Sequence, residues 1–129
     1  MNTIRQKYAS NVYEAVKKYQ KENSKNKTAL DEYGGMALKL PVLVHTAGLA
    51  QALAFVKSRG KTSLDALLDD LAQVINEKDA DNFLKRSREA KLQDYVYLTK
   101  KSLTALEWFK RYAQSVLNVE STDDDGSSS

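Results

Sequence analysis

The sequence contains no cysteine, which excludes disulfide bonds, thiol catalysis and a cysteine zinc site. Histidine occurs only once, at His45, so the chain has no histidine pair for a metal site. One proline and five glycines among 129 residues supply little of the turn chemistry that a sheet-rich fold requires. The N-terminal MNTIRQKYAS is polar from its start, unlike a signal peptide, which predicts a cytoplasmic protein. These features favour an all-α protein with one folded domain.

The most apolar stretch is Met36–Val56, and its composition indicates buried helix. It is interrupted by four residues that do not suit a membrane span: Lys39, Pro41, His45 and Gly48. Alanine and leucine, both strong helix formers, outnumber the β-branched and aromatic residues that strands favour. We therefore predict two buried helical pieces that meet near Gly48, with Pro41 kinking the first piece or lying in its early turn.

Apolar residues recur at spacings of three and four along most of the chain, which predicts a compact bundle of about six helices. The expected helices run from about 2 to 22, from 28 towards 48, from 49 to 59, from about 62 to 75, from about 81, and from about 89 to 117. The last is the longest and is apolar on two sides, so we expect it to pass through the bundle centre. Five side chains are predicted to be buried: Leu49, Leu53, Phe55, Leu103 and Leu106.

Local signals predict how several helices begin. The expected N-caps are Thr28 for the second helix, either Thr62 or Ser63 for the fourth, and Asp81 for the fifth. The Gly34–Gly35 pair costs about 1 kcal/mol per glycine inside a helix. Two explanations are open. Either a function or the close approach of another segment requires glycine at both positions, or the helix begins after the pair.

Charge is distributed unevenly along the chain. The segment from Glu120 onward holds four acids and no base, so residues 1–119 carry 20 bases against 13 acids, a net charge of +7. A body of that charge attracts polyanions, including nucleic acids. We assign residues 1–118 to one helical domain and residues 119–129 to a disordered acidic tail. On the first helix, Lys17, Lys18 and Lys21 form either a polyanion-binding face or an ordinary solvated one.

No set of residues points to catalysis or to a cofactor. Asp69–Asp70 lie on a predicted solvated helix face and Asp123–Asp125 in the tail, and neither pair is held as general acid–base work requires. No glycine-rich phosphate loop follows a strand. His45 is expected to be a hydrogen-bonded core or edge residue. We therefore predict no catalytic residue, no metal, no cofactor and no small-molecule substrate.

Two stretches resemble the small-subunit family of type III-B CRISPR effectors, the Cmr complexes. The first, YGGMALKLPVLVHTAGLAQALAFVKSRG at residues 33–60, carries the steps Leu40–Pro41, Gly48–Leu49 and Ala54–Phe55 in the family's order. The second, ALEWFKRYA at residues 105–113, carries the family's "ALxW" step followed by a basic pair. The likeness covers about residues 1–118.

The resemblance implies a non-catalytic structural subunit. Several copies would stack along the Cmr filament beside the subunits that hold the guide RNA, and would line the groove for target RNA. The implied partners are other Cmr subunits, neighbouring small subunits and the duplex of target and guide RNA, with no membrane. Cleavage would belong to the backbone subunits.

The candidate RNA-binding residues are basic ones inside or beside the two signatures, followed by those on the first helix: Lys39, Lys57, Lys110, Arg111, Lys17, Lys18 and Lys21. Contact through phosphates would be blind to sequence, with specificity supplied by guide pairing. Trp108 is either a packing residue or a platform for a base. The alternative function is a helical protein–protein adaptor without nucleic-acid contact, which salt-dependent RNA binding would distinguish.

Overall fold

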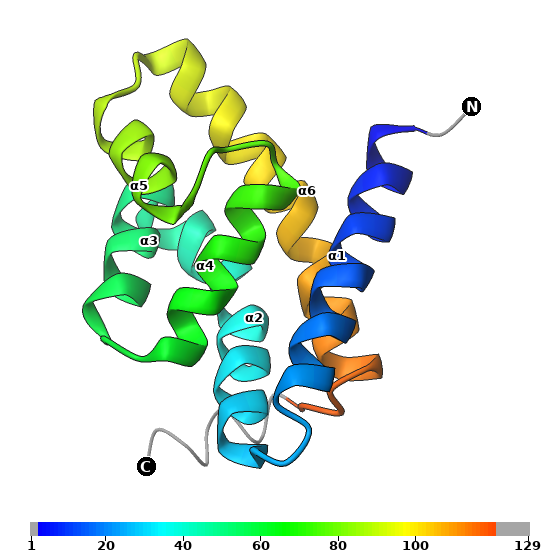
Figure 1. The fold of residues 1–129 in the computed structure, drawn as a ribbon. Helices are drawn as coiled ribbons and strands as arrows, with labels where there is room; N and C mark the ends of the chain where they lie inside the picture. Colours follow the sequence, from blue (N-terminus) through cyan, green and yellow to red (C-terminus); the bar gives the residue numbers. More distant parts are fainter. Residues whose placement is uncertain (1–2, 121–129) are drawn as a thin grey trace.

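The computed structural model describes residues 3–120, which form a bundle of six helices without any strand (Figure 1). The helices are α1 (Ile4–Glu22), α2 (Lys27–Ala47), α3 (Leu49–Ser58), α4 (Thr62–Val74), α5 (Ala80–Glu89) and α6 (Leu92–Ser115). Both the predicted helical class and the long C-terminal helix are confirmed, since α6 spans 24 residues. No helix among the described residues is long and apolar enough to cross a membrane.

The bundle has two groups of helices that share α4. α6 packs mainly against α1 and α2, while α3 and α5 pack against each other and against α4 (Figure 1). α4 also contacts α1, α2 and α6, so its apolar residues join the two groups into one core. The side of α6 away from this core lies between α1 and α2, and this position decides where a groove forms.

The junction of α2 and α3 lies at Gly48, as predicted. Gly48 adopts φ 88°, a left-handed conformation that glycine accepts without strain. No side chain at position 48 caps α3, and the Tyr95 hydroxyl instead accepts the Ala50 N–H at 3.1 Å. Pro41 lies inside α2, which continues past it to Ala47.

The glycine pair lies inside α2, and at Gly34 the segment after α6 approaches the helix closely. A Cβ atom added to Gly34 would lie 2.5 Å from Cγ2 of Val119. Val119 is 1% exposed, and the Gln20 side-chain amide donates to the Val116 carbonyl at 2.9 Å, which holds the segment after α6 against α1. Val119, the first residue of the predicted tail, is thus packed against the bundle. Residues 121–129 lie outside the described part of the chain.

Three further local predictions need correction. The N-cap of α2 is Asn26, whose side chain accepts the Ala29 N–H, and the N-cap of α5 is Asp79 in place of the expected Asp81. α4 begins after Lys61 without a side-chain cap, so neither Thr62 nor Ser63 caps it. Both side-chain caps lie two residues before their predicted positions, because nearby polar residues compete to accept the same free N–H groups.

The predicted core is correct for Leu49, Leu53 and Leu106, correct only in part for Leu103, and wrong for Phe55. Leu49, Leu53 and Leu106 are fully buried, and Leu103 is partly buried against the core. Phe55 is 41% exposed, and its ring lies 5.8 Å from the guanidinium of Arg59. α3 buries one stripe formed by Leu49, Ala52, Leu53 and Val56, and position 55 lies outside that stripe.

Candidate nucleic-acid interface

The seven predicted RNA-binding residues do not form a single surface. Lys17, Lys18 and Lys21 lie on α1, Lys39 on α2, Lys57 on α3, and Lys110 and Arg111 on α6. All are exposed except Lys39, which is partly buried. Their surroundings differ, and these differences separate the candidates.

Lys57 lies in acidic surroundings. Its ammonium group is 3.7 Å from a carboxylate oxygen of Asp65. The same depression is lined by Asp69, Asp79 and Asp81. Four carboxylates around one lysine repel a phosphate more than that lysine attracts it. The position of Lys57 therefore argues against a phosphate contact.

Lys18 lines a second groove, between α1 and α4, that also contains carboxylates. Glu14 and Asp70 line this groove with it. Asp70 accepts a hydrogen bond of 2.6 Å from the Tyr33 hydroxyl. Burial raises the pKa of Asp70 to about 6, and the neighbouring Asp69 charge acts in the same direction, while the Tyr33 hydrogen bond and Lys18 oppose the shift. This groove has mixed charge.

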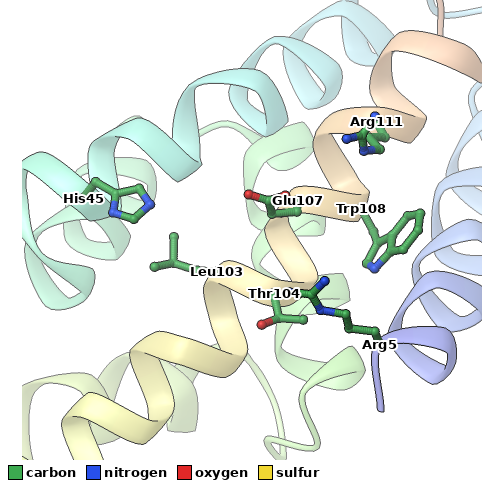
Figure 2. Close-up of a pocket in the computed structure, with 7 residues that line it drawn as sticks. All are labelled: Arg5, His45, Leu103, Thr104, Glu107, Trp108 and Arg111. Atoms are coloured by element: carbon green, nitrogen blue, oxygen red, sulfur yellow. The ribbon is translucent and has the colours of Figure 1, made fainter. Parts of the chain in front are cut away.

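A third groove, which we call the α6 groove, carries the basic character that a polyanion requires. Its volume is ≈ 630 Å³, and it is open to solvent between α1 and α2 (Figure 2). α6 forms its floor, α1 contributes one wall residue and α2 another. The lining residues are Arg5, His45, Leu103, Thr104, Glu107, Trp108 and Arg111.

The periodicity of α6 explains the floor of this groove. Leu98, Ser102, Ala105, Leu106, Phe109 and Ala113 are buried and form the core side of the helix. Residues 104, 107 and 111 lie on the opposite side, because one turn takes 3.6 residues, and Leu103 lies at one edge, partly buried against the core. Trp108 lies at the edge, where its ring stacks on Tyr112 at 5.8 Å between centroids and Tyr112 meets Tyr13 of α1 at 5.3 Å. Trp108 is thus partly a packing residue.

The charged groups of the α6 groove have no partners within the described residues. Neither Arg5 nor Arg111 forms an ion pair with any residue of 3–120, and Glu107 forms none either. His45 is exposed at the C-terminal end of α2, contrary to the expectation of a hydrogen-bonded core or edge residue. The guanidinium groups of Arg5 on α1 and Arg111 on α6, which form no ion pair within residues 3–120, can each bind a phosphate with two parallel hydrogen bonds.

Of the predicted residues, only Arg111 lines the α6 groove. Lys110 is its exposed neighbour, and Lys39 lies six residues before His45 on α2, about 9 Å along the helix axis. Sequence reasoning missed the contributions of Arg5 and His45. The four-residue spacing of Glu107 and Arg111 does indicate from sequence that the two side chains share one face of a helix. No sequence pattern places Arg5 or His45 next to that face.

Within residues 3–120, no group of three or more histidine, aspartate or glutamate side chains has an arrangement that could hold a metal ion. The lining of the α6 groove offers guanidinium, imidazole, hydroxyl and carboxylate groups to a ligand. This chemistry suits the recognition of a sugar–phosphate chain.

Comparison with known proteins identifies the family. The model of the CRISPR-associated Cmr5 family, Cas_Cmr5, matches residues 4–116. The curated "CRISPR system Cmr subunit Cmr5" of Thermus thermophilus is 48% identical over 117 residues, which cover 91% of this chain and 98% of that protein. A crystal structure of a CRISPR-associated Cmr5 family protein, also from Thermus thermophilus, matches with a TM-score of 0.76 at 46% identity, over 90% of this chain and 98% of that one. These matches confirm the family that the two sequence signatures indicated: the chain belongs to the Cmr5 family of CRISPR-associated proteins.

Proposed function

We propose that this chain is a non-catalytic structural subunit of a type III-B CRISPR effector, the Cmr complex, and that it lines the path of target RNA with the α6 groove. The observation that carries this proposal is that two arginines, Arg5 on α1 and Arg111 on α6, line the same groove and form no ion pair with any residue of 3–120. The similarity to a Cmr subunit supports the assembly.

In this proposal several copies stack along the filament, next to the subunits that hold the guide RNA. Arg5 and Arg111 bind phosphates, and the nearby Lys39 and Lys110 add long-range attraction. Because phosphates are the same at every position, the contact carries no sequence information, and pairing with the guide supplies specificity. Lys57 takes no part, because Asp65 and its acidic neighbours surround it.

The test uses the complex reconstituted with an Arg5→Ala/Arg111→Ala variant, with Lys57→Ala as the control for loss of one positive charge. Target-RNA affinity is measured at two or more salt concentrations. Each lost phosphate contact should flatten the plot of log affinity against log salt by roughly one unit. The slope of the double variant should therefore fall by about two units, and by the same amount for any target that matches the guide. The slope of the Lys57→Ala control should not change.

Two results would contradict the proposal in different ways. An unchanged salt slope with normal assembly would mean that Arg5 and Arg111 do not bind phosphate. Failure of the double variant to assemble would mean that these arginines contact a neighbouring subunit, which is the alternative function of a protein–protein adaptor. Circular dichroism of the free variant shows whether it folds, and both side chains are exposed, so we expect normal folding.

A further inference from the structure

The α6 groove presents hydrogen-bond acceptors at its centre, between two arginines on one side and His45 on the other. Glu107 lies between His45 on one side and Arg111, Trp108 and Arg5 on the other (Figure 2). Its carboxylate makes no ion pair with any residue of 3–120, although two arginines line the same groove. A carboxylate at this position repels phosphate, so a site built for phosphate alone gains nothing from it.

Thr104 offers a second acceptor beside Glu107. Its hydroxyl donates to the Lys100 carbonyl at 3.0 Å, so the proton is already used and the oxygen of this lining residue keeps its lone pairs as an acceptor. Leu103 and the ring of Trp108 add apolar surface to the same floor. The floor therefore suits a neutral group that donates a hydrogen bond and has carbon atoms around it.

We propose that Glu107 and Thr104 form a subsite for a ribose 2′-hydroxyl, which makes the α6 groove selective for RNA over DNA. The inference rests on the proposed function and adds the class of sugar that the groove accepts. An RNA strand alternates phosphates with 2′-hydroxyl donors, whereas a DNA strand lacks the donor. With phosphates at Arg5 and Arg111, the intervening ribose lies over the floor of the groove and donates its 2′-hydroxyl proton to the Glu107 carboxylate.

The carboxylate thus acts in opposite directions on the two nucleic acids. Its charge weakens the binding of both strands, because each brings phosphates to the rim of the groove. Only RNA recovers this loss, through a hydrogen bond to a charged acceptor, which is stronger than one between neutral groups. Amino groups on bases could also donate to Glu107, but both RNA and DNA carry them, so they give no sugar selectivity.

The test measures binding of the full chain to three single strands of identical sequence: RNA, DNA and 2′-O-methyl RNA. Fluorescence anisotropy at fixed low salt reports the affinities. We expect RNA to bind roughly five- to tenfold more tightly than the other two, an order of magnitude set by one charge-assisted hydrogen bond in a solvated groove. The 2′-O-methyl strand keeps the RNA sugar conformation but lacks the donor, so it should bind like DNA.

Two variants test the assignment, and one serves as a matched control. Glu107→Gln should raise the affinity for DNA and for 2′-O-methyl RNA, and lower the RNA-to-DNA ratio several-fold. Thr104→Val should lower that ratio by roughly two- to threefold, because a weaker, neutral acceptor is lost. Glu14→Gln makes the same charge change in the groove between α1 and α4, nine residues and half a helical rotation from Arg5, and should leave the ratio unchanged.

The outcomes separate this inference from the proposed function. If none of the three strands binds in a salt-dependent manner, the RNA-binding function itself fails, and the subsite fails with it. Salt-dependent binding of equal strength to all three strands keeps the function and overturns the subsite. The subsite is also overturned if 2′-O-methyl RNA binds like RNA, or if Glu107→Gln strengthens all three strands by the same factor.

Discussion

Replacing Gly34 by alanine should destabilise this protein, although alanine is the better helix former. The new Cβ would lie 2.5 Å from Cγ2 and 3.1 Å from Cβ of Val119. Val119 is fully packed and β-branched, so it cannot rotate away without leaving the core. Overpacking of this kind costs about 1–3 kcal/mol, and the gain in helix propensity returns about 1 kcal/mol. We expect a net loss of about 1 kcal/mol in the free energy of unfolding.

A double-mutant cycle with Val119→Ala tests the cause of that loss, with chemical denaturation as the assay. Val119→Ala alone should cost about 1–3 kcal/mol, because it leaves a small cavity beside Gly34. In the double variant the methyl group at position 34 partly fills this cavity and no longer meets Cγ2. Its loss should be smaller than the sum of the two single losses by at least about 1 kcal/mol. Strictly additive losses would refute the claim that Val119 is the reason for glycine at position 34.

Three further predictions concern the pH dependence, the core and the chain end. Because burial raises the pKa of Asp70 to about 6 from an ordinary 3.8, the folded state holds this proton more tightly than the unfolded state. The resulting stabilisation is complete below about pH 4 and is lost as the pH rises through 6, a change of at most about 3 kcal/mol in the free energy of unfolding. Denaturation measured across this pH range should show the change in the wild-type protein and not in Asp70→Asn. Leu53→Ala should cost about 2–5 kcal/mol as a truncation of a fully buried side chain, and a loss below about 0.5 kcal/mol would contradict the place of Leu53 in the core. Deleting residues 121–129 should leave the melting temperature nearly unchanged. It should raise non-specific RNA affinity in a filter-binding assay, because three acids are removed from a basic chain. A decrease in both the melting temperature and the affinity would mean that this segment binds to the bundle.

The local elements of this protein were predictable because helices depend on residues within about one turn of each other. The spacing of apolar residues located all six helices, and Gly48 by itself marked the junction of α2 and α3. The N-caps of α2 and α5 lie two residues before their predicted positions, because polar side chains that are close along the chain are nearly equivalent as caps. The two family signatures were also local, and they correctly identified the Cmr5 family.

Tertiary packing decided the rest. Glycine at position 34 is explained only by Val119, which reaches it from the far end of the chain. Phe55 was expected in the core, but the single buried face of α3 leaves it exposed. Lys57 and Arg111 were equivalent candidates by sequence, yet one lies among carboxylates and the other lines an open basic groove. Arg5 and His45 line that groove from α1 and α2. Helix periodicity determines which face of its own helix each residue occupies, but only the packing of the helices determines which faces lie next to each other.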